Sequence, residues 1–183
     1  EAGPDDVPGA PAIRLANLRH YLLARQKADV LAVGEAAGYQ GMRWSGIAFT
    51  SERDLARWGA PYHRTSRSRL NGWSEPSGTI VHGLLEELGA EQRVILWNTV
   101  PAHPHLPGLT MSNRRPIRGE VEQGVVFLDR LIGVMQPATI VAVGRIAESI
   151  LGDRGALYVR HPAQSGATAF RDGMRRILLA RSA

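Results

Sequence analysis

Three short segments of the chain concentrate residue types that bind ligands and carry out chemistry. The first contains an acid, a base and an aromatic residue, Glu35, Arg43 and Phe49, among glycines at positions 34, 38, 41 and 46. The second, residues 98–105, begins with an asparagine, and the third, residues 161–167, begins with a histidine. Glycine at this density lets backbone N–H groups approach a ligand closely. We therefore expect these segments to line one binding cleft.

Several common kinds of site are excluded by what the chain lacks. The spacing of Gly34 and Gly38 gives only GxxxG, so the GxGxxG motif of dinucleotide sites is absent, as are the P-loop and GxSxG motifs. The chain has no cysteine, which rules out disulfides, thiolate zinc sites and cysteine-ligated iron–sulfur clusters. His103 and His105 have no carboxylate partner nearby, so we expect no metal and no other cofactor.

The composition favours one globular domain with a polyanionic partner. The chain has 183 residues, 44% of them apolar, and a formal net charge of +5. All but one of its 22 basic residues are arginines, the exception being Lys27. Arginine suits bidentate contacts to phosphates, which points to nucleic acid first, although GC-rich codon usage also produces this bias. No apolar run approaches the roughly 20 residues that span a bilayer, and no signal peptide is visible, so we expect a cytoplasmic protein without membrane contact.

The candidate segments each follow a short apolar run of the kind that forms a buried strand. Such runs occupy residues 29–33, 93–97, 139–143 and 156–160. Helices are predicted between and around them, at residues 13–27, 51–58, 77–88, 118–135, 145–151 and 169–179. This alternation predicts an α/β fold, a three-layer αβα sandwich with a central four-stranded parallel sheet. Residues 1–12 are expected to be a flexible N-terminal tail and residues 13–183 a single domain.

Three ordered motifs resemble those of the uracil-DNA glycosylase superfamily. GEAAGYQGMRWSGIAFTSE, residues 34–52, resembles the GEAPG-type motif of the iron–sulfur bacterial and archaeal enzymes. LWNTVPAHPH, residues 96–105, resembles the strand whose Asn reads uracil, and RHPAQSGA, residues 160–167, resembles the loop that carries the catalytic His. NRRPIRGE, residues 113–120, is similar to an NRxP-like stretch of the same branch. The resemblance implies a DNA-repair enzyme that hydrolyses the N-glycosidic bond of uracil in DNA and leaves an abasic site.

The resemblance also implies roles for individual residues. Phe49 would stack on the extruded uracil, and Asn98 would match the uracil edge at O4 and N3–H. His161 would stabilise the departing uracil anion at O2, as an oxyanion hole does. Each role has a structural alternative, namely a core phenylalanine, an asparagine at a strand end and a packed histidine before proline. The full expected substrate-binding set is Gly34, Ala36, Gly38, Tyr39, Phe49 and Asn98, and the catalytic set is His161, Glu35 and Asn98.

The chain departs from the family pattern at several of these positions. Ala36 stands where the uracil-specific enzymes have the Asp that positions water, and Glu35 is then the nearest carboxylate, unless it is the structural partner of an arginine. Gly38 replaces the tyrosine that blocks thymine, with Tyr39 one place later. Ser165 replaces the wedge leucine that fills the emptied base stack, a task that Gln164 could take. The DNA-contacting set is expected to be Arg43, Arg114, Arg115, Gln164, Ser165 and Gly166.

Three readings of the function remain open at this point. The first is a cluster-free, monomeric glycosylase acting on uracil in single- or double-stranded DNA. The second keeps the fold but changes the base to hypoxanthine, xanthine or another deaminated base. The third is a protein that binds uracil-containing DNA without releasing the base or traps it covalently; the covalent relatives carry a His near the NRRP stretch, and residues 113–118 contain none.

Overall fold

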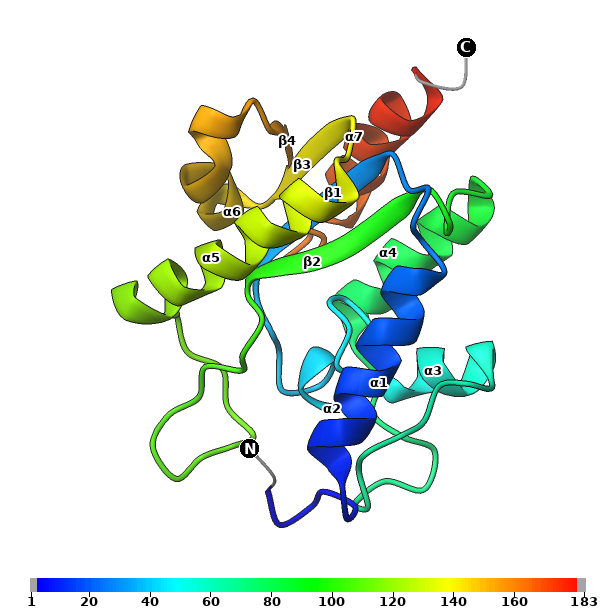
Figure 1. Cartoon of the computed structure of the whole chain (residues 1–183), viewed down its shortest axis with the longest axis vertical. Coiled ribbons are helices and arrows are strands. Elements are labelled where there is room, and N and C mark those ends of the chain that lie inside the picture. Colours follow the sequence, from blue (N-terminus) through cyan, green and yellow to red (C-terminus); the bar gives the residue numbers. More distant parts are fainter. Residues whose placement is uncertain (1–2, 181–183) are drawn as a thin grey trace.

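The computed structural model describes residues 3–180, which fold around one four-stranded parallel sheet with helices on both faces (Figure 1). The strands are β1 (Val30–Ala36), β2 (Val94–Val100), β3 (Thr139–Val143) and β4 (Leu157–Val159). Their order across the sheet is β2-β1-β3-β4, and every neighbouring pair is parallel. The predicted α/β three-layer sandwich is confirmed.

Helices on both faces bury the apolar strands. Figure 1 shows α5 in front of the sheet and α4 and α7 behind it. α5 contacts β2, α6 contacts β3 and α7 contacts β4. The α-helices of the described residues are α1 (Ala10–Leu23), α2 (Met42–Ser45), α3 (Glu52–Trp58), α4 (Pro76–Glu87), α5 (Arg118–Met135), α6 (Arg145–Leu151) and α7 (Ala167–Leu179).

Two strands are longer at their carboxyl ends than the apolar runs suggest. β1 extends to Ala36 and β2 to Val100, because Gly34 pairs with Asn98 and Ala36 with Val100 in the parallel ladder. Asn98 therefore lies within a strand rather than just after one. The ladder satisfies the backbone of this polar stretch, so strand geometry continues where hydrophobicity has stopped. This extension holds the candidate site residues on rigid backbone.

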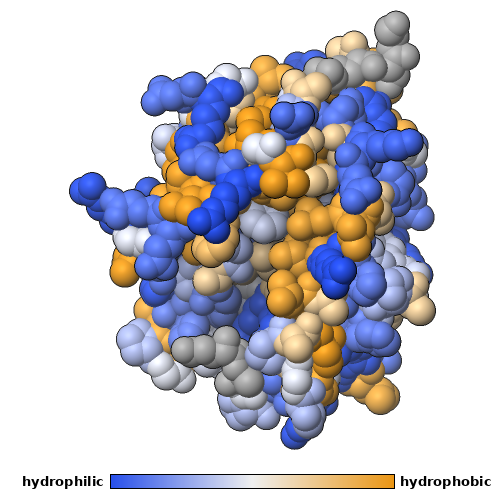
Figure 2. Space-filling model, viewed as in Figure 1, coloured by the Kyte–Doolittle hydropathy of each residue, from blue (hydrophilic) through white to orange (hydrophobic). Residues whose placement is uncertain are grey.

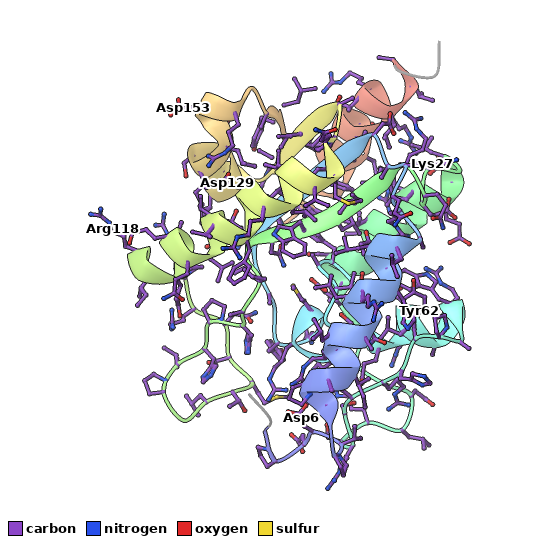
Figure 3. All side chains as sticks on the ribbon, in the orientation of Figure 1. Asp6, Lys27, Tyr62, Arg118, Asp129 and Asp153 are labelled. Atoms are coloured by element: carbon purple, nitrogen blue, oxygen red, sulfur yellow. The ribbon has the colours of Figure 1, made fainter. Side chains whose placement is uncertain are left out.

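The segment before α1 differs from the expected flexible tail over residues 3–9. The Val7 N–H donates to the Thr65 carbonyl at 2.8 Å, and the buried carboxylate of Asp6, labelled in Figure 3, pairs with Arg14 at 2.8 Å. The helix begins at Ala10 rather than near residue 13, with a proline in its first turn, where no intrahelical N–H is required. This segment is thus packed onto the loop around Thr65.

A tyrosine of α1 closes the outer edge of β2. The Tyr21 hydroxyl accepts a hydrogen bond from the Leu96 N–H at 2.8 Å and donates to the Val94 carbonyl at 3.5 Å. Tyr21 is fully buried, and this burial raises the pKa of its phenol above the ordinary value. Two of the backbone groups that an edge strand normally leaves unpaired are therefore satisfied from within the chain.

A glycine sets the distance between α5 and the strand that carries Asn98. A Cβ atom at Gly124 would collide with the Thr99 carbonyl oxygen, so the helix packs directly on the β2 backbone. The outward faces of α1 and α5 remain at the surface. Figure 2 shows apolar residues among hydrophilic ones on this side of the molecule. The exposed large apolar residues of α1 and α5 include Leu15, Leu23, Phe127 and Val134. Tight packing is thus confined to the inner side of α5.

Candidate active site

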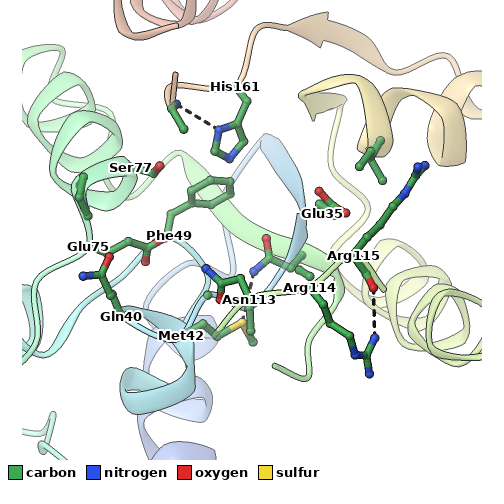
Figure 4. Close-up of a pocket in the computed structure, with 17 residues that line it drawn as sticks. Glu35, Gln40, Met42, Phe49, Glu75, Ser77, Asn113, Arg114, Arg115 and His161 are labelled. Carbon is green, nitrogen blue, oxygen red and sulfur yellow. Dashed lines mark hydrogen bonds between the residues drawn. The ribbon is translucent and has the colours of Figure 1, made fainter. Parts of the chain in front are cut away.

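A cavity of about 600 Å³ lies at the carboxyl end of the sheet, and all three chemistry-bearing segments contribute to it (Figure 4). Parallel strands end at the same edge, so the residues that follow them meet there. Further walls come from the start of α4 and from residues 113–115. The predicted site residues that line it are Glu35, Ala36, Gly38, Phe49, Asn98, Arg114, Arg115 and His161.

Asn98 lies buried on β2 directly opposite Gly34 of β1. A Cβ atom at Gly34 would lie 2.6 Å from the Asn98 Oδ1 atom and 2.5 Å from the Phe49 Cζ atom, so only glycine leaves room for both side chains. The Asn98 Nδ2 atom donates a hydrogen bond to the Met42 Sδ atom at 3.4 Å. This contact fixes which end of the amide carries the donors, and it leaves the second Nδ2 hydrogen for other partners.

Phe49 is part of the hydrophobic core and also lines the cavity. It is 5% exposed, and its ring centroid lies 5.9 Å from that of His161 at an angle of 39°. Its backbone φ is +52°, a left-handed conformation that is unfavourable for a bulky residue. Such strain persists only where the surroundings over-determine the conformation. The chain thus holds one aromatic ring between the core and the cavity.

His161 follows β4, and its ring points into the cavity toward Phe49 (Figure 4). The Ala163 N–H donates to the His161 Nδ1 atom at 3.1 Å, so a neutral imidazole carries its proton on Nε2. Burial, and then the charge of Arg160, lower the pKa of His161 below its usual range. The ring is therefore a neutral hydrogen-bond donor at physiological pH.

The sequence model of the Uracil DNA glycosylase superfamily matches residues 22–179. The chain belongs to this superfamily. A search of the curated proteins found no match. Membership in the uracil-DNA glycosylase superfamily indicates a hydrolase of the glycosidase type that acts on DNA in base excision repair, and it agrees with the strand-end cavity described above.

Glu35 occupies the rim of the strand-end cavity beside Arg115 (Figure 4). Burial raises the pKa of Glu35 above its ordinary value, and the nearby charge of Arg115 partly offsets this rise. Ala36 comes next on β1 and also lines the cavity. Glu35 thus lies near an arginine, as expected if it were the structural partner of one, and it also lines the cavity, as expected if it acted there.

Two of the predicted DNA-contacting arginines have structural partners that the sequence did not indicate. Arg114 forms a bidentate pair with Glu120 at 2.7 and 2.8 Å, and this pairing lowers the pKa of Glu120 to about 2. Arg43 lies outside the cavity. The Cζ atom of its guanidinium lies 4.1 Å from the centroid of the Trp44 ring. Arg43 lines a second cavity of about 590 Å³ beside α1. Arg115 is thus the predicted arginine that borders the strand-end cavity without such a pair among the described residues.

The remaining predicted residues surround the cavity without lining it. Gln164 and Ser165 form the turn between β4 and α7 with backbone φ values of +52° and +62°, and Gly166 precedes α7. Tyr39 packs edge-on against Trp73 at 6.0 Å between ring centroids. The turn after His161 therefore lies next to the site.

The lining residues that the sequence did not single out include two polar ones with informative surroundings, Asn113 and Glu75. The Asn113 Oδ1 atom accepts hydrogen bonds from the Tyr39 N–H at 3.0 Å and from His103 Nε2 at 3.3 Å, which ties the first motif to the segment after β2. Glu75 is the N-cap of α4, directly before Pro76. Glutamate is not among the favoured N-cap residues. This unusual residue at the start of a predicted helix is the sequence feature that could have drawn attention to Glu75.

Residues 3–180 show neither a metal site nor a membrane-spanning helix. This part of the chain contains no group of three His, Asp or Glu side chains placed to hold a metal ion. None of its helices is long and apolar enough to cross a membrane.

Proposed function

We propose that the protein removes uracil from DNA by hydrolysing the N-glycosidic bond, leaving an abasic site. One observation carries this proposal, the meeting of the Phe49 ring, the Asn98 amide and the neutral His161 imidazole in one cavity of about 600 Å³. These are an aromatic face, a base-reading amide and an anion-stabilising donor. A base flipped out of the DNA stack needs all three before its glycosidic bond can break.

Base recognition follows from the positions of Phe49 and Asn98. Stacking of a base on an aromatic ring contributes roughly 1–3 kcal/mol. The Asn98 carbonyl oxygen would accept from uracil N3–H, and the Nδ2 hydrogen not used by Met42 would donate to O4. Cytosine presents the opposite pattern at this edge. An amide held by Met42 therefore favours uracil over cytosine.

His161 would act as the leaving group departs. As the bond between C1′ of the sugar and N1 of the base breaks, its electron pair moves onto the uracil ring, and negative charge develops at O2. The Nε2–H of the neutral His161 donates to this oxygen, while its Nδ1 atom stays engaged by Ala163. A protonated histidine would lose the Ala163 hydrogen bond, so the neutral form is the form that the site holds ready.

Gly38 supports a second candidate, a wider range of deaminated bases. This residue lines the cavity, and a Cβ atom built on it would meet no described atom within 4 Å. A larger base such as hypoxanthine or xanthine would have room on that side. The choice between the two is a matter of substrate, with the same fold and the same departing-anion chemistry.

We also propose that a single protomer acts on chromosomal DNA in the cytoplasm. Arg115 at the rim and the backbone N–H group of Ser165 are proposed to contact phosphates of the strand that carries the flipped base, whereas the Gly166 N–H already donates to the Ala163 carbonyl at 3.0 Å. Uracil costs less to extrude from single-stranded or mismatched DNA, so these substrates are expected to react fastest.

The decisive experiment uses one end-labelled oligonucleotide with a single uracil, presented single-stranded, opposite A and opposite G. Alkali-labile cleavage at the uracil supports excision, and matched oligonucleotides with cytosine, thymine, hypoxanthine or xanthine define the range of bases. A stable gel shift without cleavage would favour a lesion-binding protein. Neither cleavage nor a uracil-dependent shift would contradict the proposal.

A further inference from the structure

Glu75 lies at the start of α4, across the cavity from Glu35 (Figure 4). Its Oε2 atom is buried and has no hydrogen-bond partner among residues 3–180. Glu75 occupies the N-cap position, yet it makes no side-chain capping hydrogen bond to the helix. A buried carboxylate oxygen that neither caps a helix nor pairs with a cation calls for an explanation.

Another buried acid shows how this chain normally satisfies such a group. Glu52 is fully buried, and its carboxylate accepts hydrogen bonds from the N–H groups of Thr65 and Ser66 at 2.8 Å and of Trp73 at 3.1 Å. The same fold therefore supplies backbone donors where an acid has a structural task. Glu75 receives no such donors for Oε2 among residues 3–180.

Close packing nevertheless holds Glu75 in place. A Cβ atom at Gly41 would lie 2.5 Å from the carboxyl carbon of Glu75, so the first motif leaves space for this carboxylate only because residue 41 is glycine. Three residues after Glu75, Gly78 packs against the carbonyl group of Phe49. Glu75 is thus held between the first motif and the backbone of Phe49, and it lines the same cavity as the Phe49 ring.

The surroundings of Glu75 favour a proton acceptor that works near neutral pH. Burial, with a smaller contribution from Asp54 on α3, raises the pKa of Glu75 to about 7. Across the cavity the charged and titratable groups are Glu35, Arg114, Arg115 and His161. Arg115 partly offsets the raised pKa of Glu35, whereas the causes of the shift at Glu75 include no cation. A base is most effective when its pKa lies near the working pH.

We propose that Glu75 is the general base that activates the hydrolytic water. It would take the task of the water-positioning Asp, whose place in the first motif is occupied by Ala36. This inference rests on the proposed uracil excision. The water oxygen forms the new bond to C1′, and one of its protons passes to the Glu75 carboxylate. The bond between C1′ and N1 breaks, and its electron pair leaves on the base, which His161 stabilises. The proton then moves from Glu75 to solvent or to the departed base.

The test compares single-turnover uracil release by the wild type, Glu75→Gln and Glu35→Gln across pH 5 to 9. We expect Glu75→Gln to slow release by 100-fold or more, to bind uracil-containing DNA within about twofold of the wild type, and to lose the rise in rate through pH 7. The control is Glu87→Gln, at the far end of the same helix, where an exposed pair with Arg175 is removed and the rate should not change.

A stability measurement covers the case in which the slow variant is simply misfolded. The folded protein keeps the Glu75 proton up to about pH 7, whereas the unfolded chain releases it near the ordinary glutamate pKa of 4.5. The wild type therefore loses stability from this group as pH rises from 4.5 through 7. Glu75→Gln cannot titrate, so its Tm relative to the wild type should be higher at pH 8 than at pH 5.

Three results would overturn the assignment. The first is release by Glu75→Gln within threefold of the wild type with the same pH profile. The second is loss of the rise through pH 7 in Glu35→Gln but not in Glu75→Gln. The third is a Tm difference that is the same at pH 5 and pH 8. Failure of the proposed function is a separate result, because a wild type that releases no uracil refutes that function and this inference together.

Discussion

Asn98 divides its amide hydrogens between the protein and the cavity. One Nδ2 hydrogen is held by the Met42 sulfur, and Oδ1 lies against Gly34, so the amide has a defined orientation before any base arrives. His161 is prepared in the same way, because Ala163 selects its tautomer. Preorganisation of this kind lets polar groups act on a transition state without reorganising at the moment of reaction.

Removing either group tests the site at the residue scale. We expect Asn98→Ala and His161→Ala each to reduce uracil release by about 10²–10³-fold, the usual effect of losing one preorganised donor. Single-turnover cleavage assays would measure the loss, and circular dichroism would check that both variants fold. Normal turnover by both variants would contradict the assignment of the site.

Phe49 requires a different comparison because it lies in both the core and the cavity. Phe49→Ala should weaken binding of uracil-containing DNA by roughly 1–3 kcal/mol, as expected for one lost stacking contact. Binding of the same oligonucleotide without uracil should change much less. Competition titrations with the two oligonucleotides give both values, and equal losses in both would mean that Phe49 acts only as a core residue.

At the scale of elements, the site depends on how closely helices pack on the strands that carry it. α5 reaches the β2 backbone through Gly124, and this contact lies one residue from Asn98, at Thr99. α3 begins with a capping box in which the Ser51 N–H donates to the Asp54 carboxylate at 2.8 Å, and so fixes the chain just after Phe49. Both contacts act on the backbone next to a proposed site residue.

Glycines of α5 provide a matched test of this packing. Gly124→Ala should destabilise the protein by about 1–3 kcal/mol, because its methyl group would meet the Thr99 carbonyl oxygen. Gly133→Ala on the same helix meets nothing within 4 Å and should stabilise the protein by about 0.5–1 kcal/mol through helix propensity. Urea unfolding gives both values. The same sign for both substitutions would contradict the close contact.

Strongly patterned elements were predicted well from the sequence, whereas short and ladder-dependent ones were not. α5, α6 and β3 have the predicted bounds because their apolar periodicity or continuous apolar run matches burial on the sheet. α2, at four residues, is too short to show a period. The contact between Arg114 and Glu120, six residues apart, depends on the irregular turn before α5, which no periodicity predicts. The placement of Glu75 at the cavity depends on how distant segments pack.

For the molecule as a whole, a buried histidine links stability to pH. The Nε2 atom of His82, on α4, lies 3.0 Å from the hydroxyl oxygen of Thr50. His82 is 4% exposed. Burial lowers the pKa of His82 to about 4. Between about pH 6.5 and 4 the unfolded chain binds a proton that the folded protein refuses, so this group costs stability as the pH falls.

This linkage is measured as a difference between the wild type and His82→Gln. The free energy of unfolding of the wild type relative to the variant should fall by up to about 1.4 kcal/mol per pH unit as the pH drops from 6.5 to 4. Taking the difference cancels the opposite contribution of Glu75, which both proteins share. A difference that does not vary with pH would contradict a neutral His82 in the folded protein.

The hydroxyl of Tyr21 has a consequence for how the protein behaves when it is crowded. Bare strand edges recruit strands from other molecules, and such recruitment is how cross-β fibrils start and grow. The phenol of Tyr21 already holds the Val94 carbonyl and the Leu96 N–H, and the strand at the opposite border of the sheet, β4, has only three residues. The phenolic oxygen of Tyr21 therefore occupies two of the backbone groups through which β2 could recruit a strand from another molecule, and β4 offers only a short template.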